Sequence, residues 1–132
     1  MDFSLSHEQQ ALVDSAARFA KTRLAPYYRA REKAERVERE IVQEMGALGF
    51  LGLELPEEHG GLGLDCVTSG LLLEQIAYGD FNVSYVNLLT SLCGQIVATH
   101  ARSDAAQSWL QQVIAGDKLI AIALTEPSAG SD

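Results

Sequence analysis

Apolar residues recur at the spacing of one helix face along most of this chain, and this periodicity restricts the possible folds strongly. From Leu12 to Leu24 an apolar residue stands at every fourth position, as one stripe of a helix requires. Further stripes of this kind occupy residues 37–48, 66–78, 83–97 and 109–113. The pattern therefore predicts a bundle of helices. The stretch 83–97 is apolar around much of its circumference, which favours a central place in that bundle.

Residues with known capping preferences stand at the expected helix ends. Ser6 and Gln9 have the spacing of a capping box at the start of the first helix. Asp65 and Asp104 are suited to cap two later helices at their amino ends. Gly49 is suited to end the second helix in the left-handed conformation. These residues support the helix boundaries that the periodicity predicts.

Two stretches interrupt the helical pattern. Pro26 predicts a break or kink, and the charged residues 27–40 that follow predict a solvated helix. Residues 50–63 contain four glycines and one proline, so we expect an irregular connection there that its leucines hold in place.

The composition fits one folded domain and excludes several classes of partner. The chain has 132 residues, 47% of them apolar, and a net charge of −8. That charge disfavours binding to nucleic acid or to an anionic membrane surface. No apolar run approaches the roughly 20 residues that span a bilayer, and the first residues do not resemble a secretory or transit signal. We expect a cytoplasmic protein, or one of an organelle matrix if a transit peptide has been removed.

The potential metal ligands are few and scattered. Cys66 and Cys93 both lie in apolar helical stretches, where a free thiol is usually buried. The three histidines, His7, His59 and His100, have no ligand spacing among them. We therefore expect no metal site.

The pattern changes after residue 117. Residues 118–124 read Lys-Leu-Ile-Ala-Ile-Ala-Leu, which predicts a short strand, and residues 125–132 form a turn-rich loop. A single strand in a helical chain has nothing to pair with, which indicates that a second domain is missing.

The loop at residues 125–132 has groups that suit a polar ligand. The Thr125 hydroxyl can hydrogen-bond the edge of a heterocycle. Ser128, Gly130 and Ser131 leave backbone N–H groups free to approach an anion, and Pro127 stiffens the turn. From these residues alone, an ordinary Ser/Gly/Pro turn remains the alternative.

Four segments of the sequence resemble the acyl-CoA dehydrogenase family. Leu124–Asp132 is very similar to that family's flavin-binding pattern, Thr/Ser-Glu-Pro-x-Ala-Gly-Ser-Asp. Leu55–Gly63 resembles its Pro-x-x-x-Gly-Gly-x-Gly loop, and Phe3–Leu12 and Met45–Gly49 resemble its first helices. The order and spacing of all four agree over the whole chain.

The resemblance implies an all-α fold class. It is the amino-terminal helical bundle of an acyl-CoA dehydrogenase-like fold, ending in the first strand of a missing β-domain. Residues 1–117 would be the helical domain, and residues 118–132 would be the first strand and flavin-binding loop of a truncated middle β-domain. A carboxy-terminal four-helix bundle completes such proteins, which share one FAD among their domains.

The resemblance also implies a cofactor site in the tail. The residues that would line FAD are Ile122, Ala123, Leu124, Thr125, Glu126, Pro127, Ser128, Ala129, Gly130 and Ser131. Leu124 and Thr125 would contact the isoalloxazine ring, and Ser131 would lie near the pyrophosphate and the substrate thioester. The family often has an aromatic residue where Ile122 stands, which puts a stacking contact there in doubt.

The implied reaction is the α,β-dehydrogenation of an acyl-CoA to a trans-2-enoyl-CoA. A glutamate takes the α-proton, flavin N5 receives the β-hydride, and electrons pass to an electron-transfer flavoprotein. The base is expected in the missing carboxy-terminal domain, so this chain holds no catalytic residue and is expected to be inactive alone. Glu126 is assigned to loop structure and Glu74 to a satisfied polar group. The complete enzyme would be a homo-oligomer, a homotetramer, of fatty acid metabolism.

Two other functions stay open at this point. A non-catalytic helical partner or scaffold module could derive from the same family, and an acyl-CoA oxidase would pass its electrons to oxygen. The stripe at residues 83–97 is assigned to bundle core rather than to the wall of an acyl pocket. Tyr85 and Asn87 are candidates for facing the substrate.

Overall fold

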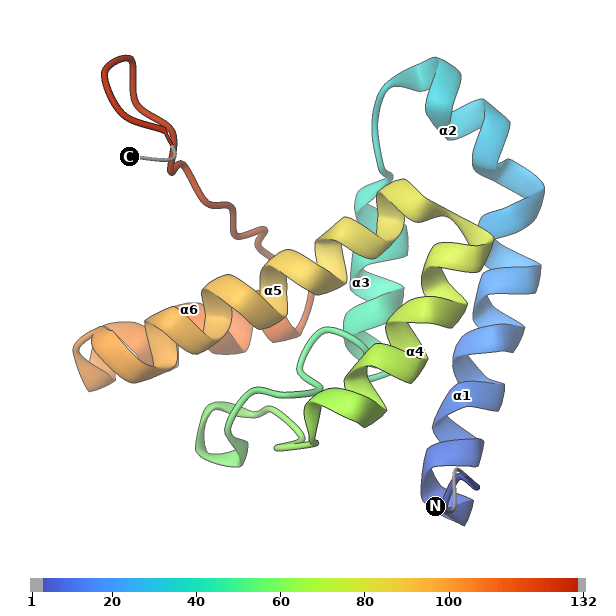
Figure 1. The fold of residues 1–132 in the computed structure, drawn as a ribbon, viewed down its shortest axis with the longest axis horizontal. Helices are drawn as coiled ribbons and strands as arrows, with labels where there is room; N and C mark the ends of the chain where they lie inside the picture. The colour runs from blue at the N-terminus through green and yellow to red at the C-terminus, as the bar shows by residue number, and fades with distance from the viewer. Residues whose placement is uncertain (1–3, 131–132) are drawn as a thin grey trace.

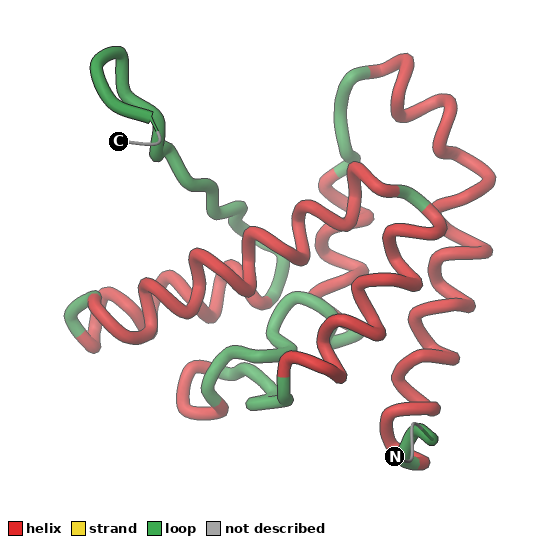
Figure 2. The backbone as a smooth tube through the Cα atoms, in the orientation of Figure 1, coloured by secondary structure: helices red, strands yellow, loops and turns green. Residues whose placement is uncertain are grey.

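The computed structural model describes residues 4–130, apart from the side chains of residues 103 and 105–107, and this part of the chain is helical with no strand (Figure 2). The all-α prediction is therefore confirmed. The six α-helices, in chain order, are α1 (His7–Phe19), α2 (Tyr28–Ala34), α3 (Arg39–Ala47), α4 (Cys66–Gly79), α5 (Phe81–His100) and α6 (Ser103–Ile114). Three short helical segments complete the described part: η1 (Ala20–Leu24), η2 (Ala25–Tyr27) and η3 (Glu57–His59).

The long helices pack in a row. Helix α4 lies between α1 and α5, and α6 lies against the other side of α5 (Figure 1). Helix α2 projects from the end of the bundle where α4 meets α5, and the carboxy-terminal segment leaves the helices and extends away from them. Helix α5 has α4 and α6 as neighbours, and its remaining surface is covered only in part.

The first helix begins at the predicted capping box. The Ser6 hydroxyl accepts a hydrogen bond from the Gln9 N–H at 3.1 Å, and the Gln9 side chain accepts one from the Ser6 N–H at 3.0 Å. The break predicted at Pro26 is spread over two segments. The π-helical turn η1 precedes Pro26 and the 3-10 turn η2 contains it, because proline has no N–H to continue the α-helical ladder.

The charged stretch 27–40 forms two helices instead of the single one that we predicted. Helix α2 ends at Ala34, and Glu35 then adopts a left-handed conformation with φ of 52°. Helix α3 starts only at Arg39. The left-handed residue cannot continue a helix, so the chain turns back toward the bundle.

One core cluster joins α1, α3, α4 and the start of α5. Its largest fully buried side chains include Phe50, Met45, Leu72 and Ile76, and Phe50 packs edge to face against Phe19 with ring centroids 5.7 Å apart. Leu51, Leu53 and Leu55 of the irregular connection are also buried, as expected for residues that hold it in place. Burying these apolar side chains is the main favourable contribution to folding.

The connection between α3 and α4 needs glycine at a point of close backbone approach. A Cβ atom built on Gly61 would lie 2.1 Å from the Leu55 carbonyl oxygen, so no larger residue fits there. The predicted left-handed end of the second helix is confirmed, because Gly49 has a φ of 77°. These glycines let residues 50–63 fold back against the helices.

Two predictions about single residues are wrong. Asp104 does not cap α6, because the helix begins at Ser103, two residues before the start that a cap at Asp104 would give, and Arg102 occupies the N-cap. Cys66 is exposed, since it starts α4 on the outer face, whereas Cys93 is buried as expected. Asn87 is buried and donates a hydrogen bond to the Phe50 carbonyl, and its place beside a substrate stays a prediction.

Two predictions about longer segments also differ from the structure. Helix α5 is not fully enclosed, because Tyr85, Leu88 and Leu92 on one of its faces are 43–50% exposed. Residues 118–124 form no strand in the described part of the chain. These residues have no neighbouring strand with which to pair. The only β-bridge among the described residues joins Glu126 to Ala129.

Candidate functional site

The tail that carries the candidate site is an exposed segment with a tight turn at its end. Every residue from 121 to 130 is exposed, and the segment stands clear of the helices (Figure 1). The Glu126 N–H donates to the Ala129 carbonyl at 2.8 Å, and the Ala129 N–H donates to the Glu126 carbonyl at 3.3 Å. These two bonds close the Glu-Pro-Ser-Ala turn. Glu126 thus serves the loop through its backbone, consistent with the structural role expected for it.

The polar groups of this tail are available to a ligand. Within the described residues, the hydroxyls of Thr125 and Ser128 have no hydrogen-bond partner. The side chains of Ile122 and Leu124 beside them are 45% and 78% exposed. Exposed apolar side chains next to unpaired hydroxyls suit a ligand that has both a flat apolar face and polar edges, as a flavin has.

The predicted cofactor residues Ile122 to Gly130 therefore form one continuous accessible segment. Ser131, which was predicted to contact both cofactor and substrate, lies outside the described residues. The groups present fit FAD, because the helices cover none of the tail residues from 121 to 130. A flavin site needs protein on more than one side of the ring system, and the tail of this chain supplies one side.

A second recess lies between α4 and α5. It is an apolar groove of about 330 Å³ lined by Gly70, Leu73, Glu74, Ala77, Phe81, Ser84, Tyr85 and Leu88. The rings of Phe81 and Tyr85 meet edge to face along it, with centroids 5.3 Å apart. Its volume lies within the roughly 300–1,000 Å³ usual for small-molecule sites. We call this recess the α4–α5 groove.

An exposed apolar face runs along α5 beside this groove. Phe81, Tyr85, Leu88, Leu92 and Ile96 follow one another at helical spacing on α5, and each is 43–59% exposed. The distance from Tyr85 to Ile96 along the helix is about 16 Å. Near the far end of α5, Val97, Trp109 and Ile120 line a smaller recess of about 190 Å³. Val97 lies on a different side of α5 from Leu88, so this recess is separate from the exposed face.

Sequence reasoning missed the groove, although its signal was present. The spacing of Phe81, Tyr85 and Leu88 places them on one helix face, but periodicity alone does not tell a buried face from an open one. Glu74 was expected to be a satisfied polar group. It is instead exposed at the groove and has no hydrogen-bond partner among the described residues.

Helix α4, which forms one wall of the groove, is fixed at its start by Asp65. One Asp65 carboxylate oxygen accepts hydrogen bonds from the N–H groups of Val67 and Thr68, both at 2.9 Å, and the other accepts the Thr68 hydroxyl at 3.0 Å. The hydrogen bonds from the Thr68 backbone and then its hydroxyl hold the pKa of Asp65 below its ordinary value. The N-cap predicted at Asp65 is confirmed.

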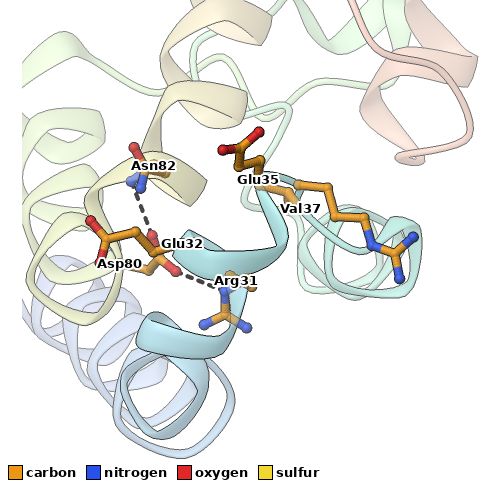
Figure 3. A pocket seen from close by; sticks show the side chains of 7 residues that line it. Arg31, Glu32, Glu35, Val37, Asp80 and Asn82 are labelled. Carbon is orange, nitrogen blue, oxygen red and sulfur yellow. Dashed lines mark hydrogen bonds and ion pairs between the residues drawn. The ribbon is translucent and has the colours of Figure 1, made fainter.

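A larger cavity, of about 530 Å³, lies where α2 meets the start of α5, and its lining is charged (Figure 3). Arg31 donates from Nε to Asp80 Oδ2 at 2.7 Å, and it also donates to the Leu24 carbonyl. Asp80 Oδ1 accepts from the N–H groups of Asn82 at 3.0 Å and Val83 at 3.3 Å. The arginine and aspartate are both almost fully buried. The two charges compensate each other, and Asp80 also caps α5. The pair therefore stabilises the fold.

Two further classes of site, a metal centre and a membrane-spanning helix, are absent from the part of the chain that the structure describes. No cluster of three or more histidine, cysteine, aspartate or glutamate side chains there could hold a metal ion. Nor does any described helix combine the length and apolar character needed to cross a bilayer.

Comparison with known proteins places this geometry in a family. The family model described as "Acyl-CoA dehydrogenase, N-terminal domain" matches residues 6–117. This chain belongs to the acyl-CoA dehydrogenase family, and residues 6–117 are its amino-terminal domain. A benzylmalonyl-CoA dehydrogenase of Aromatoleum aromaticum is 35% identical over 133 aligned residues, which cover 100% of this chain and 35% of that protein.

Solved structures show the same helical arrangement. A glutaryl-coenzyme A dehydrogenase in complex with glutaryl-CoA superposes with a TM-score of 0.92 at 29% identity, over 100% of this chain and 34% of the other. PigA with FAD and proline gives a TM-score of 0.88 at 27% identity, over 99% of this chain and 35% of the other. The chain thus spans about a third of the length of the relatives that it matches.

Proposed function

We propose that these residues are the amino-terminal part of an FAD-dependent acyl-CoA dehydrogenase. In this proposal residues 1–117 are its helical domain. Residues 118–132 would supply the first strand, once a neighbouring strand of the complete protein pairs with it, and the flavin-binding loop of the middle β-domain. The observation that carries the proposal is the exposed tail, whose unpaired hydroxyls and apolar side chains stand clear of the helices. Membership of the family and the FAD held by the structural relative PigA support it.

Each tail residue has a distinct part in holding FAD. We propose that Leu124 packs on the ring system while the Thr125 hydroxyl and backbone bond its polar edge. Ile122 and Ala123 would lie beside the ring, and Glu126 and Pro127 would set the turn. Ala129 would hold the turn through its bond to Glu126, and Ser128, Gly130 and Ser131 would turn their N–H groups toward the pyrophosphate, since closely spaced N–H groups attract anions. When bound, FAD supplies the hydride acceptor for the reaction.

The substrate would be an acyl-CoA thioester that becomes a trans-2-enoyl-CoA. We propose that Ser131 lies near the thioester and that the α4–α5 groove takes the far end of the acyl group. Tyr85 and the apolar face of α5 support this placement, because they are exposed at and beside the groove. Such walls orient the acyl group and exclude water from the reacting carbons.

The proton-abstracting base is proposed to lie outside this chain, in the carboxy-terminal domain of the complete protein. The exposed carboxylates beside the candidate site, Glu74 and Glu126, lack the burial that turns a carboxylate into a competent base. The 132 residues alone would therefore be inactive. The complete enzyme is proposed to be a homo-oligomer of the cytoplasm or of an organelle matrix, most simply a homotetramer.

The proposed electron acceptor is an electron-transfer flavoprotein. The alternative within the enzyme class is an acyl-CoA oxidase, which would pass its electrons to oxygen. Which acceptor is used depends on how the complete protein covers the flavin, so the two are separated by the rate at which each reagent reoxidises the reduced flavin.

The test is to purify the complete polypeptide that carries these residues and to record its absorbance spectrum. We expect a yellow protein whose flavin band is bleached under anaerobic conditions by saturated acyl-CoA thioesters of four to sixteen carbons. We expect an electron-transfer flavoprotein to restore the band faster than oxygen does. A colourless protein that takes up no added FAD would contradict the proposal and favour a non-catalytic scaffold module.

A further inference from the structure

We propose, building on the function proposed above, that Lys118 is a positioning residue for the flavin loop. Its ammonium group lies over the ring of Trp109 and, in the proposed enzyme, sets the angle at which the flavin-binding tail leaves the helical domain. The inference concerns how the flavin is placed relative to the helices. It does not concern which groups of the tail touch the flavin.

Residues 116–118, which connect α6 to the tail, are held by two helices, and we call them the tail root. The last two N–H groups of the root donate to the Gln112 carbonyl of α6, at 2.9 and 3.0 Å. Helix α3 holds the root from another side, because Arg39 donates to the Asp117 carbonyl and the Gln43 side chain donates to Asp117 Oδ1 at 3.3 Å. The root is therefore fixed to both α3 and α6.

The backbone of the root packs directly on the backbone of α3. Gly116 has a φ of 79°, and a Cβ atom built on it would lie 2.5 Å from the Val42 carbonyl oxygen. A Cβ atom built on Gly46 of α3 would lie 2.4 Å from the carbonyl oxygen of Ala115. Contacts this close leave the root no other path, so we expect it to move with the helical domain as one body.

Lys118 makes the last polar contact to the helices in the described part of the chain. Its Nζ lies 3.9 Å from the centroid of the Trp109 ring on α6, well inside the distance at which a cation is attracted to an aromatic face. Ile120 still lines the recess beside Trp109. Among the described residues, however, 119–125 make no hydrogen bond, and 121–130 are exposed. The direction of the tail is therefore set at Lys118.

A small change of angle at Lys118 becomes a large displacement at the flavin loop. Thr125 follows Lys118 by seven positions, and an extended chain advances about 3.3 Å per residue, so the two lie about 23 Å apart. A tilt of about 20° at Lys118 would displace Thr125 by about 8 Å. In the proposed enzyme the tail pairs within the β-domain, so this angle sets how the flavin meets a substrate held by the helices. Misplacement by about 1 Å can lower a rate about 100-fold.

The contact between Lys118 and Trp109 can be changed without disturbing the core. The Trp109 ring is 53% exposed, and a cation over a ring at such a site shifts an equilibrium by about two- to fivefold. Lys118→Met keeps the apolar stem and removes the charge. Lys118→Arg keeps a cation that also stacks on aromatic rings. These two variants separate the charge from the bulk of the side chain.

The experiment measures flavin reduction in the complete protein by anaerobic stopped-flow absorbance, with hexanoyl-CoA as the reductant. We expect Lys118→Met and Trp109→Leu each to lower the rate constant at saturating thioester about two- to fivefold. The FAD content and the thioester concentration that gives half the maximal rate should change little, because neither side chain is proposed to touch the ligands. Lys118→Arg should restore the wild-type rate.

Two further measurements separate positioning from stability. Because Lys118 and Trp109 act through one contact, the double variant Lys118→Met/Trp109→Leu should be no slower than either single variant. The thermal midpoint of each variant should stay within about 3 °C of the wild type. The matched control is Lys33→Met, which removes an exposed ammonium group from α2, outside the tail root, and should leave the rate unchanged.

Three results would overturn the inference: a Lys118→Met variant that is reduced at the wild-type rate, a Lys118→Arg variant as slow as Lys118→Met, or a double variant in which the two losses multiply. If hexanoyl-CoA does not bleach the flavin of the wild type, the proposed function itself is contradicted and this inference with it. The wild-type reaction thus distinguishes the two failures.

Discussion

Asp80 combines two structural roles in one carboxylate. Its Oδ1 caps α5 through the N–H groups of Asn82 and Val83, and its Oδ2 receives the buried Arg31 guanidinium. The pair joins the projecting helix α2 to the junction of α4 and α5. Removing one partner of a buried ion pair leaves the other charge unpaired in a poorly hydrated place, which is more harmful than removing both.

The first prediction separates these two roles. Asp80→Asn keeps a side-chain oxygen for the cap but leaves the buried Arg31 with only its longer ion pair to Glu38, at 3.7 Å, and should lower the free energy of unfolding by about 3 kcal/mol. Asp80→Ala also loses the cap and should cost about 1 kcal/mol more. Adding Arg31→Met to Asp80→Asn should restore part of the loss. Urea denaturation of the four proteins measures this, and an Asp80→Asn variant as stable as the wild type would show that the pair contributes nothing.

The second prediction concerns Asp65 and pH. Hydrogen bonds to its carboxylate lower its pKa in the folded state below 3.8, so the ionised form stabilises the fold. This stabilisation is complete above pH 3.8 and is lost as the pH falls through the folded-state pKa. The thermal midpoint of the wild type should therefore exceed that of Asp65→Asn at neutral pH, and the gap should close in strong acid. Circular dichroism from pH 7 to pH 2 checks this. A gap that does not depend on pH would rule out the charged carboxylate as its source.

At the scale of elements, the segment that leads into the tail exposes apolar residues on both of its sides. Leu119 is 53% exposed, Ile122 45% and Leu124 78%. In a complete enzyme of the proposed kind these residues would be covered by neighbouring strands. In the 132-residue chain these residues form no strand, but their exposed apolar side chains and backbone offer an open edge with which a strand of another chain can pair.

The third prediction follows from that open edge. Replacing Ile122 and Leu124 together by lysine should reduce self-association of the 132-residue polypeptide at high concentration, because charge on an edge opposes strand pairing. The helical circular dichroism signal should stay unchanged, since neither side chain packs in the core. Sedimentation velocity measures the effect. The exposed Leu48, replaced by lysine, is a matched control outside the tail. If the double variant and the wild type self-associate equally, the surface that causes self-association lies elsewhere, for example on α5.

Local signals in the sequence were sufficient for most helix ends. The capping box of Ser6 and Gln9, the Asp65 cap and the left-handed Gly49 each depend on residues within a few positions of one another. The tight turn at Glu126–Ala129 is local in the same sense. The prediction of an N-cap at Asp104 failed because a polar residue two positions away from the true N-cap gives nearly the same sequence signal for a helix start.

Features that depend on distant residues could not be predicted. Arg31 and Asp80 are 49 positions apart, and Arg31 stands in a charged stretch that looks entirely solvated. Whether the apolar face of α5 is covered depends on which helices pack beside it, which periodicity does not encode. The prediction of a strand at residues 118–124 failed for a related reason, because a strand exists only where another one pairs with it.

At the scale of the whole molecule, the chain carries two separate features that the proposed function uses. One is the α4–α5 groove, and the other is the exposed tail with the predicted flavin residues. The chain spans about a third of the length of its relatives, and in the proposed complete enzyme further domains would close the site around both features.

The central claim is that the tail holds the flavin, and amide hydrogen exchange tests it most directly. The complete protein would be compared with and without FAD, and the exchange of residues 121–130 followed by mass spectrometry. We predict strong protection of this segment on FAD binding, with little change in α2 and α3. If the protein binds FAD while exchange at residues 121–130 stays the same, the flavin site lies elsewhere and the account is contradicted.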